Sequence, residues 1–486
     1  MAIDIGTTST KALVVSSHGQ VLMAAQQGYR THYPQPGFAE QEPEEVWQAV
    51  ATVIRQCCQA HGPAIRAASF SCAMHSLMAV DERNDPLTRF IIWADARSSA
   101  EARELKNSSE GASIYSGTGT PIHPMSPLLK LRWSQRNSPE LFSKVKRFVS
   151  IKEYVLHRLC DQWVVDYSVA SASGLFNIHT FHWHAAALQW AGITVHQLSR
   201  CVSPYEKLQP NQAAFELGLQ PNTVLVAGAN DGCLAHWGSG ALEPGVVSLT
   251  IGTSGAVRMA SRVVAHDTAQ RLFNYRLDEQ YFITGGASNN GLVLLEWMQQ
   301  LVGSSTQVEE FALEAMQAPP GAGGLIFLPF VLGERAPLYN PDQRGVFLGL
   351  AQHHQRPHLM RALMEGVCFE LRSILVAIEE SVGSVHKVLA SGGFTRSTEW
   401  LQLMANILQK EVVLNDVHDA SALGAARMGF RSLRIEMTDT PDDRAQTFFP
   451  NPAVAGKYHE LFRIFIESNS ALLPHFSALV KLQQQG

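Results

Sequence analysis

One short pattern occurs twice in this chain, once near the N-terminus and once in the second half. DIGTTSTKAL (residues 4–13) and TIGTSGAVRM (residues 250–259) both read Ile-Gly-Thr, then small residues, then a second apolar run. Each copy predicts two strands joined by a tight turn, because a glycine interrupts the apolar run and small polar residues follow. Two copies predict two related domains, which we place at residues 1–240 and 241–486.

Length and composition agree with a chain of two domains. At 486 residues the chain is too long for one ordinary hydrophobic core. Hydrophobic residues make up 46% and charged residues 17%, the balance of a soluble globular protein. The formal net charge is -5, and no basic tail or block is present, which disfavours non-specific binding to nucleic acid or to an anionic membrane.

The cysteines and the apolar runs indicate a cytoplasmic protein. The seven cysteines include no C-x-x-C pair, so we interpret them as reduced thiols. No apolar run reaches the roughly 20 residues that span a bilayer. The N-terminus lacks a basic segment followed by a long apolar region, so no signal peptide is evident.

The order of the predicted elements is that of a mixed sheet covered by helices. In the first half, two strands over residues 2–17 are followed by a strand at 21–30, a helix at 44–58 and a buried strand at 67–74. In the second half, the sequence predicts a strand ending in a polar turn (224–232), a strand pair (245–261) and a long helix (358–382). A strand–turn–helix unit (385–408), a strand (411–415) and a small-residue helix (420–430) follow.

The first hairpin turn has the chemistry of a phosphate site. Neither G-x-G-x-x-G nor G-x-x-x-x-G-K-[ST] occurs, so a dinucleotide fold and a P-loop lose their usual support. A glycine lets the backbone turn tightly, after which N–H groups and hydroxyls can face an anion. A lysine adds positive charge, and an aspartate at the strand end could hold Mg²⁺ through water. These residues are Asp4, Gly6, Thr7, Thr8, Ser9 and Lys11. A plain β-turn with an exposed aspartate explains the same residues equally well.

Four motifs together resemble the FGGY family of carbohydrate kinases. DIGTTSTK (4–11) and TIGTSG (250–255) resemble its two phosphate motifs, and ASGGFTRSTEWLQLMANIL (390–408) resembles its adenosine motif. GANDG (228–232) resembles the strand end that carries the catalytic aspartate. The resemblance implies an α/β fold of two actin-like (ribonuclease H-like) domains, whose mixed sheets are flanked by helices and enclose a nucleotide in an interdomain cleft.

The resemblance also implies the roles of individual residues. Asp231 would be the catalytic base and, with Asp4, would bind Mg²⁺. By itself, an aspartate in such a Gly- and Asn-rich stretch more often forms an exposed turn. Gly291 fits a packing glycine as well as an ATP contact. The ATP and phosphate contacts implied are Gly6, Thr7, Thr8, Ser9, Lys11, Gly252, Thr253, Gly291, Gly392, Gly393 and Ser397. Turns from both domains would grip the nucleotide while closure expels water.

Three segments of the first domain are predicted to line the acceptor pocket. SCAMHS (71–76), IIWADARS (91–98) and TGTPIHPMSPL (118–128) resemble the family's sugar-binding segments. They supply Met74, His75, Trp93, Asp95, Arg97 and His123. A lone histidine is more often structural than a ligand, and Trp93 could belong to the core. A polyhydroxylated substrate needs hydrogen-bonding groups beside an apolar wall, and this set offers both.

Within the family the chain resembles gluconokinases. C-A-M-H-S replaces the G-Q-M-H-G of xylulokinases, and IKEY (151–154), VVDYSVASASG (164–174) and GERAPLYNPDQRG (333–345) point the same way. We therefore expect ATP-dependent phosphorylation of D-gluconate, with Arg97 or His75 facing the carboxylate. Two alternatives stay open: a kinase for xylulose or another polyol, and an actin-like nucleotide sensor without kinase activity. A homodimer is also open.

Overall fold

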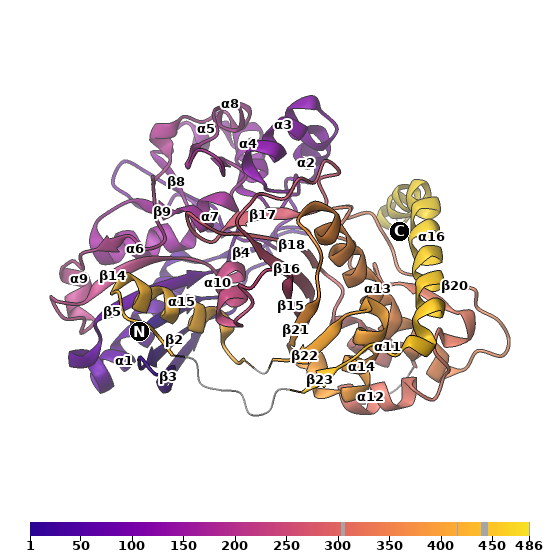
Figure 1. Cartoon of the computed structure of the whole chain (residues 1–486). Coiled ribbons are helices and arrows are strands. Elements are labelled where there is room, and N and C mark those ends of the chain that lie inside the picture. The colour runs from indigo at the N-terminus through magenta and orange to yellow at the C-terminus, as the bar shows by residue number, and fades with distance from the viewer. Residues whose placement is uncertain (303–306, 416, 439–445, 486) are drawn as a thin grey trace. The chain divides into compact units, whose positions relative to one another are not determined.

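The computed structural model describes residues 1–302, 307–415, 417–438 and 446–485. The chain forms two compact units (Figure 1). Unit 1 comprises Met1–Gly240, Phe273–Ile283 and His418–Pro441, and unit 2 comprises Ala241–Leu272, Thr284–Val417 and Asp442–Gly486. The division at 240/241 stays a prediction, and two later segments of the chain cluster with unit 1.

Helix α15 (Ala420–Ser432) explains the return of the chain to unit 1. Its small residues allow close contact with α10 (Asp231–Gly238): a Cβ on Gly424 would lie 2.1 Å from the carbonyl oxygen of Leu234. A Cβ on Gly429 of the same helix would lie 3.3 Å from Ser69 Cβ. The small-residue helix was predicted at 420–430, but its packing partners are set by tertiary structure.

The sheet of unit 1 has the strand order β13-β14-β5-β1-β2-β3. β1 pairs antiparallel with β2 and parallel with β5, and β5 pairs parallel with β14. The strand bounds are β1 Ala2–Ile5, β2 Ser9–Val15, β3 Val21–Gly28, β5 Ala67–Cys72, β13 Lys207–Leu208 and β14 Val224–Asn230. The strands predicted at 2–17, 21–30 and 67–74 are confirmed.

The second large sheet repeats this arrangement, with the order β17-β18-β16-β15-β21-β22-β23. β15 pairs antiparallel with β16 and parallel with β21, as β1 pairs with β2 and β5. The bounds are β15 Val246–Ile251, β16 Gly255–Ser261, β17 Phe273–Arg276, β18 Phe282–Ser288, β21 Lys387–Ser391, β22 Glu411–Leu414 and β23 Thr447–Phe448. The shared topology confirms the prediction of two related domains.

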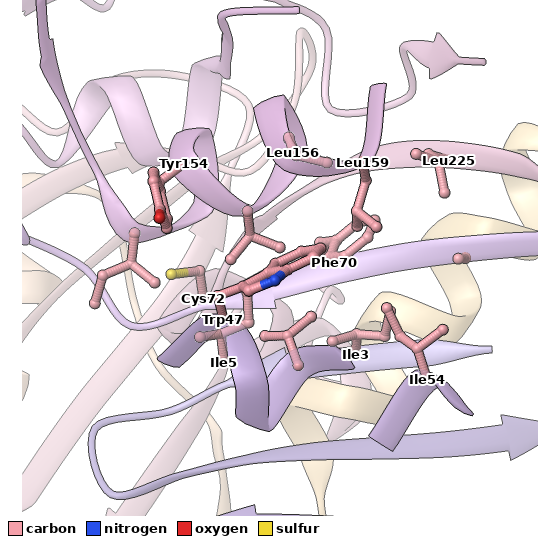
Figure 2. Packing of buried hydrophobic residues seen from close by; sticks show 14 of the residues in the cluster. Ile3, Ile5, Trp47, Ile54, Phe70, Cys72, Tyr154, Leu156, Leu159 and Leu225 are labelled. Atoms are coloured by element: carbon pink, nitrogen blue, oxygen red, sulfur yellow. The ribbon is translucent and has the colours of Figure 1, made fainter. Parts of the chain in front are cut away.

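Apolar side chains from the sheet of unit 1 pack against two helices (Figure 2). Helix α1 (Pro43–His61) begins with a proline, whose fixed φ suits a first helical position, and buries one apolar face. Helix α6 (Ile151–Cys160) adds Tyr154 and Leu159. Phe70 of β5 lies between these helices and the sheet. Its neighbour Ser69 faces α15 instead, since side chains alternate along a strand.

Shorter elements complete unit 1. Its other helices are α2 Ser99–Lys106, α3 Ser109–Thr118, α4 Pro127–Asn137, α5 Pro139–Phe142, α7 Tyr167–Ser171, α8 Ala185–Ala191 and α9 Gln212–Glu216. Short strand pairs join β4 (Glu40–Gln41) to β7 (Phe90–Ile91), β6 (Met78–Val80) to β8 (Arg147–Val149), β9 (Val164–Asp166) to β12 (Arg200–Val202) and β10 (Phe176–Asn177) to β11 (His182–Trp183). Two of the segments predicted to bind the acceptor lie between these elements: residues 91–98 between β7 and α2, and residues 118–128 between α3 and α4.

Helices of unit 2 flank its sheet. They are α11 Val293–Val302, α12 Val308–Ala315, α13 Arg356–Ser381, α14 Thr398–Leu408 and α16 Pro452–Gln485, beside the strand pair β19 (Ile326–Leu328) and β20 (Val346–Leu348). The long helix and the strand–turn–helix unit predicted at 358–382 and 385–408 are confirmed. Within the described ranges, no helix has the length and apolar content that crossing a bilayer requires.

Candidate active site

Two carboxylates lie at one edge of the unit 1 sheet. β1, β5 and β14 are parallel neighbours, so their carboxyl ends meet at the same edge. Asp4 pairs with Ser71, and Asn230 pairs with Cys72, which places Asp4 and Asp231 on either side of β5. Burial raises the pKa of the Cys72 thiol, and the charges of Asp231 and Asp4 raise it further. Asp4 and Asp231 thus flank the carboxyl end of β5.

Asp231 does not lie in the exposed turn that the sequence predicted. It is the first residue of α10, because Asn230 caps that helix by accepting a hydrogen bond from Cys233 N at 2.8 Å. The Asp231 side chain is half-buried, and its Oδ1 accepts from Gly232 N at 2.7 Å. A carboxylate at this position is stabilised by the positive end of the helix dipole. Asn-Asp-Gly is a turn signal, but Asn is equally a preferred N-cap.

The first turn (residues 6–8) is held by side chains of unit 1. Tyr29 Oη donates to the carbonyl of Gly6 at 2.5 Å, and Gln41 Nε2 donates to that of Thr7 at 2.5 Å. Trp93 Nε1 donates to Thr7 Oγ1 at 2.9 Å, so the predicted acceptor-side tryptophan also supports the predicted phosphate turn. Ser9 Oγ accepts from Gln26 at 2.9 Å. Thr8 is exposed.

The first turn of α15 meets the predicted phosphate hairpin. Ser421 Oγ donates to Asp4 Oδ2 at 2.5 Å, and Lys11 forms an ion pair with Asp419. Burial raises the pKa of Asp4, while the hydrogen bonds from Ser421 and Ser71 oppose that rise. Asp419 and Ser421 were not predicted from the sequence. DASALGAA (419–426) was interpreted only as a packing helix, and its polar start is the signal that could have identified them.

The acceptor segments converge on α7 and the residues that follow it. His75 adopts φ 66°, and its Nδ1 lies 2.7 Å from the carbonyl oxygen of Ala172. Its Nε2 lies 3.3 Å from Tyr275 Oη. Met74 and His123 are both half-buried, and His123 Nδ1 accepts from Met125 N at 3.3 Å.

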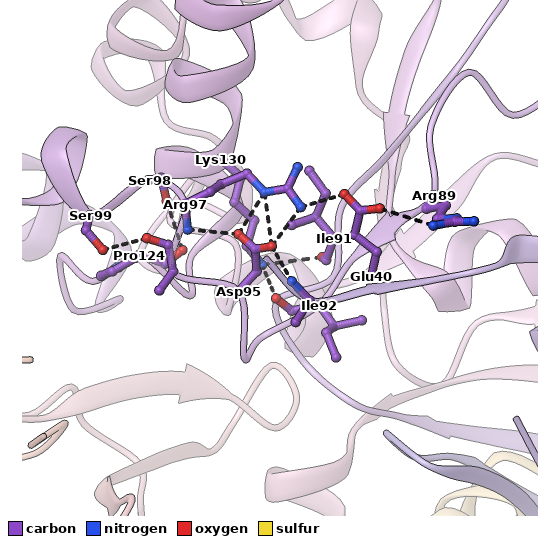
Figure 3. A network of polar contacts seen from close by, with 12 residues as sticks. Glu40, Arg89, Ile91, Ile92, Asp95, Arg97, Ser98, Ser99, Pro124 and Lys130 are labelled. Carbon is purple, nitrogen blue, oxygen red and sulfur yellow. Dashed lines mark hydrogen bonds and ion pairs between the residues drawn. The ribbon is translucent and has the colours of Figure 1, made fainter. Parts of the chain in front are cut away.

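Arg97 and Asp95 form a buried network (Figure 3). The Arg97 side chain is 5% exposed and donates to Asp95 Oδ2 at 2.8 Å and to Glu40 Oε1 at 2.6 Å. Its guanidinium lies 3.9 Å from the centre of the Phe38 ring. Asp95 Oδ2 also accepts from Ala39 N at 2.7 Å. The cation predicted to meet a sugar carboxylate thus already has two carboxylate partners, which favours a role in shaping the pocket wall. Contact between Arg97 and a substrate stays a prediction.

Lys130 contacts two of the same segments (Figure 3). It is fully buried, and its Nζ donates to the carbonyl oxygens of His75 at 2.6 Å and Ile92 at 2.8 Å. These bonds join the segment around His75 to the segment that carries Asp95. The sequence analysis did not single out this lysine, because its partners are backbone atoms distant in the chain.

Lys130 predicts a pH dependence of stability. Burial lowers the pKa of its ammonium to about 7. The unfolded value is about 10.4, so between about pH 7 and pH 10 the unfolded chain holds a proton that the folded chain has released. Raising the pH in this window therefore stabilises the folded state. We expect the difference in unfolding free energy between wild type and Lys130→Met to rise by up to ~1.4 kcal/mol per pH unit. Urea unfolding at several pH values measures it, and a flat difference would contradict the expectation.

The second turn (residues 252–254) joins β15 and β16 in unit 2. Gly291 N donates to Thr253 O at 3.2 Å, and Leu292 N donates to Gly252 O at 2.8 Å. A Cβ on Gly291 would lie 2.5 Å from Gly252 O, so this position requires glycine for packing against the turn. Thr253 is exposed, and a Cβ on Gly252 would meet no atom within 4 Å. The structure thus brings Gly252, Thr253 and Gly291 together.

The predicted adenosine motif begins where β21 ends. Gly392 has φ 100°, and a Cβ there would lie 2.4 Å from Ile251 O, directly before the second turn. A Cβ on Gly393 would lie 2.6 Å from Leu292 Cδ1, so both glycines border the cluster of Gly252 and Gly291. Ser397 is buried and caps α14, its Oγ accepting from Trp400 N at 3.2 Å. Its hydroxyl is engaged in the helix cap.

The chain is similar to known proteins along nearly its whole length. The sequence profile of the FGGY family of carbohydrate kinases, N-terminal domain, matches residues 1–238, and the C-terminal domain profile matches residues 247–433. Gluconokinase from Bacillus licheniformis is 39% identical over 505 aligned positions, covering 100% of this chain and 98% of that protein. Crystal structures of gluconate kinase and of ligand-bound xylulose kinase from Lactobacillus acidophilus each have a TM-score of 0.93 and 31% identity, covering 98% of this chain and 99% of theirs. The chain therefore belongs to the FGGY family of carbohydrate kinases.

Proposed function

We propose that this FGGY kinase transfers the γ-phosphate of ATP to D-gluconate, giving 6-phospho-D-gluconate and ADP. The observation that carries the substrate is the 39% identity to the gluconokinase of Bacillus licheniformis over the whole chain. Under the same proposal, Asp231 is the general base. It is half-buried at a helix start beside the sheet edge that also carries Asp4, so it can accept a proton from an attacking hydroxyl.

The residues of each unit have separate tasks in this proposal. The turns at 6–8 and 252–254 contact phosphates, and Gly392 and Gly393 let the backbone approach the nucleotide. Met74, His75, Trp93 and His123 contact the sugar acid, with His75 as the proposed partner of its carboxylate. Phosphoryl transfer requires little covalent chemistry from the protein, so positioning and charge stabilisation dominate catalysis.

A magnesium ion fits the carboxylates at the sheet edge. Among the described residues, no group of three or more His, Cys, Asp or Glu side chains could hold a metal ion by itself. Mg²⁺ commonly binds through one or two carboxylates and keeps water or phosphate as its other ligands. Asp4 and Asp231 would hold it here and would supply neutralisation of phosphate charge. Asp4 is fixed for this task by Ser421.

Xylulose is the second candidate acceptor, because xylulose kinase from Lactobacillus acidophilus has the same TM-score and identity as gluconate kinase. A panel of sugars and sugar acids in a coupled ADP assay tests the choice. We expect kcat/KM for gluconate to exceed that for xylulose by roughly 100-fold, since a site built for a carboxylate leaves buried polar groups unpaired with a ketose. A higher kcat/KM for xylulose than for gluconate would assign xylulose as the acceptor. Equal ADP formation with and without an acceptor would favour a nucleotide sensor.

A further inference from the structure

A short segment of unit 1, residues 166–173, is bonded to several parts of the proposed site. We call it the α7 segment, since it contains α7 and its N-cap Asp166. The carbonyl oxygen of Ala172 lies 2.7 Å from His75 Nδ1, and that of Ser171 accepts from Thr120 Oγ1 at 2.7 Å. Ser173 O accepts from Ser126 Oγ at 2.8 Å. The α7 segment therefore holds two of the three predicted acceptor segments, residues 71–76 and 118–128.

The same segment holds the residue before Asp231. Ser168 Oγ accepts a hydrogen bond from Asn230 N at 3.1 Å, and Asn230 Nδ2 donates to Ser168 O at 3.1 Å. Both residues are fully buried. Because Asn230 also caps α10, its backbone and its side chain are fixed from two sides. This clamp sets the direction in which the chain passes from β14 into α10, and with it the orientation of the adjacent Asp231.

A buried ion pair anchors the α7 segment to α6. Lys152 Nζ lies 2.6 Å from Asp166 Oδ2, and the two side chains are 1% and 0% exposed. The other oxygen of Asp166 accepts from Val169 N at 2.9 Å and so caps α7. The helix that Asp166 caps also carries Ser168, which binds the residue before Asp231, so the ion pair is linked through α7 to the proposed base.

We propose that Ser168 and Asn230 are positioning residues for Asp231, and that the α7 segment makes one rigid support for the acceptor loops and the base. The inference rests on the proposed function in taking Asp231 as the base. Transfer to a hydroxyl is sensitive to displacements of about 1 Å between reacting groups. Losing the clamp should therefore lower kcat while substrate binding, which depends on other contacts, is retained.

The decisive variant is Ser168→Ala, which removes the acceptor of Asn230 N. We expect kcat to fall about 10- to 100-fold while the KM values for ATP and acceptor change less than about threefold. The matched control is Thr223→Val, just before β14. Thr223 is fully buried, and its Oγ1 donates to Ile65 O at 2.9 Å at the opposite end of the same strand pair. Both variants should lose similar stability in thermal unfolding, but only Ser168→Ala should lose turnover.

Turnover is measured with whichever acceptor in the panel the wild type prefers, so a wrong substrate does not affect this comparison. Equal kcat for Ser168→Ala and wild type would overturn the positioning role and leave the kinase assignment intact. Crystal structures of both proteins give a readout independent of activity, and we expect a displaced Asp231 carboxylate in the variant. An unmoved carboxylate, or equal losses of kcat in Ser168→Ala and Thr223→Val, would also overturn it.

Discussion

Replacing Asp231 by asparagine should lower kcat by about 10²- to 10⁴-fold, the range that general acid–base catalysis contributes. Asparagine keeps the size of the side chain and its acceptor oxygen, so the contact from Gly232 N and the fold of α10 can persist. The amide cannot take up the proton of the attacking hydroxyl. Because Asp231 is also proposed to hold Mg²⁺ with Asp4, the KM for ATP is measured at saturating Mg²⁺, where it should stay within about threefold of the wild-type value.

Steady-state kinetics with ATP and the preferred acceptor measure this effect, and Asp161→Asn is the matched control. Asp161 is exposed, ends α6 and has φ 55°, a conformation that asparagine tolerates equally well. The control should have wild-type kcat. If Asp231→Asn retained more than about a tenth of wild-type turnover, a different group would have to act as the base.

Local patterns in the sequence were sufficient to predict the two hairpins. In each, a glycine interrupts an apolar run, and the structure has β1–β2 and β15–β16 at these places. The glycines at and around the second turn were identified through the resemblance to the FGGY family, and the structure brings Gly252 and Gly291 together. Such features depend on residues close together in the chain, where turn chemistry and strand periodicity act directly.

Features that depend on distant residues were not predictable. Arg97 could be identified as a cation beside Asp95, but its second carboxylate partner Glu40 is 57 residues away, so the pattern gave no sign that two carboxylates bind it. Asp419 and Ser421 reach Lys11 and Asp4 only because α15 packs on the first sheet. For Asp231 the local signal was ambiguous, since Asn-Asp-Gly suits both a turn and a helix start.

The buried pair of Lys152 and Asp166 predicts a large loss of stability when one partner is removed. Lys152→Met keeps much of the side-chain volume but leaves the Asp166 carboxylate uncompensated at 0% exposure. Removing one partner of a buried pair costs about 3–5 kcal/mol, because the remaining charge stays desolvated. We expect the unfolding free energy in urea to fall by that amount. Lys146→Met should cost about 1 kcal/mol or less, since its ion pair with Glu82 is exposed to solvent.

The double variant Lys152→Met/Asp166→Asn separates charge from geometry. Asparagine removes the uncompensated charge but keeps an oxygen that can accept from Val169 N, so the cap of α7 is retained. The double variant should therefore be more stable than Lys152→Met alone by about 1–3 kcal/mol. If it were less stable than Lys152→Met, the carboxylate would be stabilised by groups other than Lys152. The kcat of the double variant is a second readout. If its unfolding free energy recovered but its kcat stayed below the wild-type value, the ion pair would be needed to hold the α7 segment in its active position as well as to keep it folded.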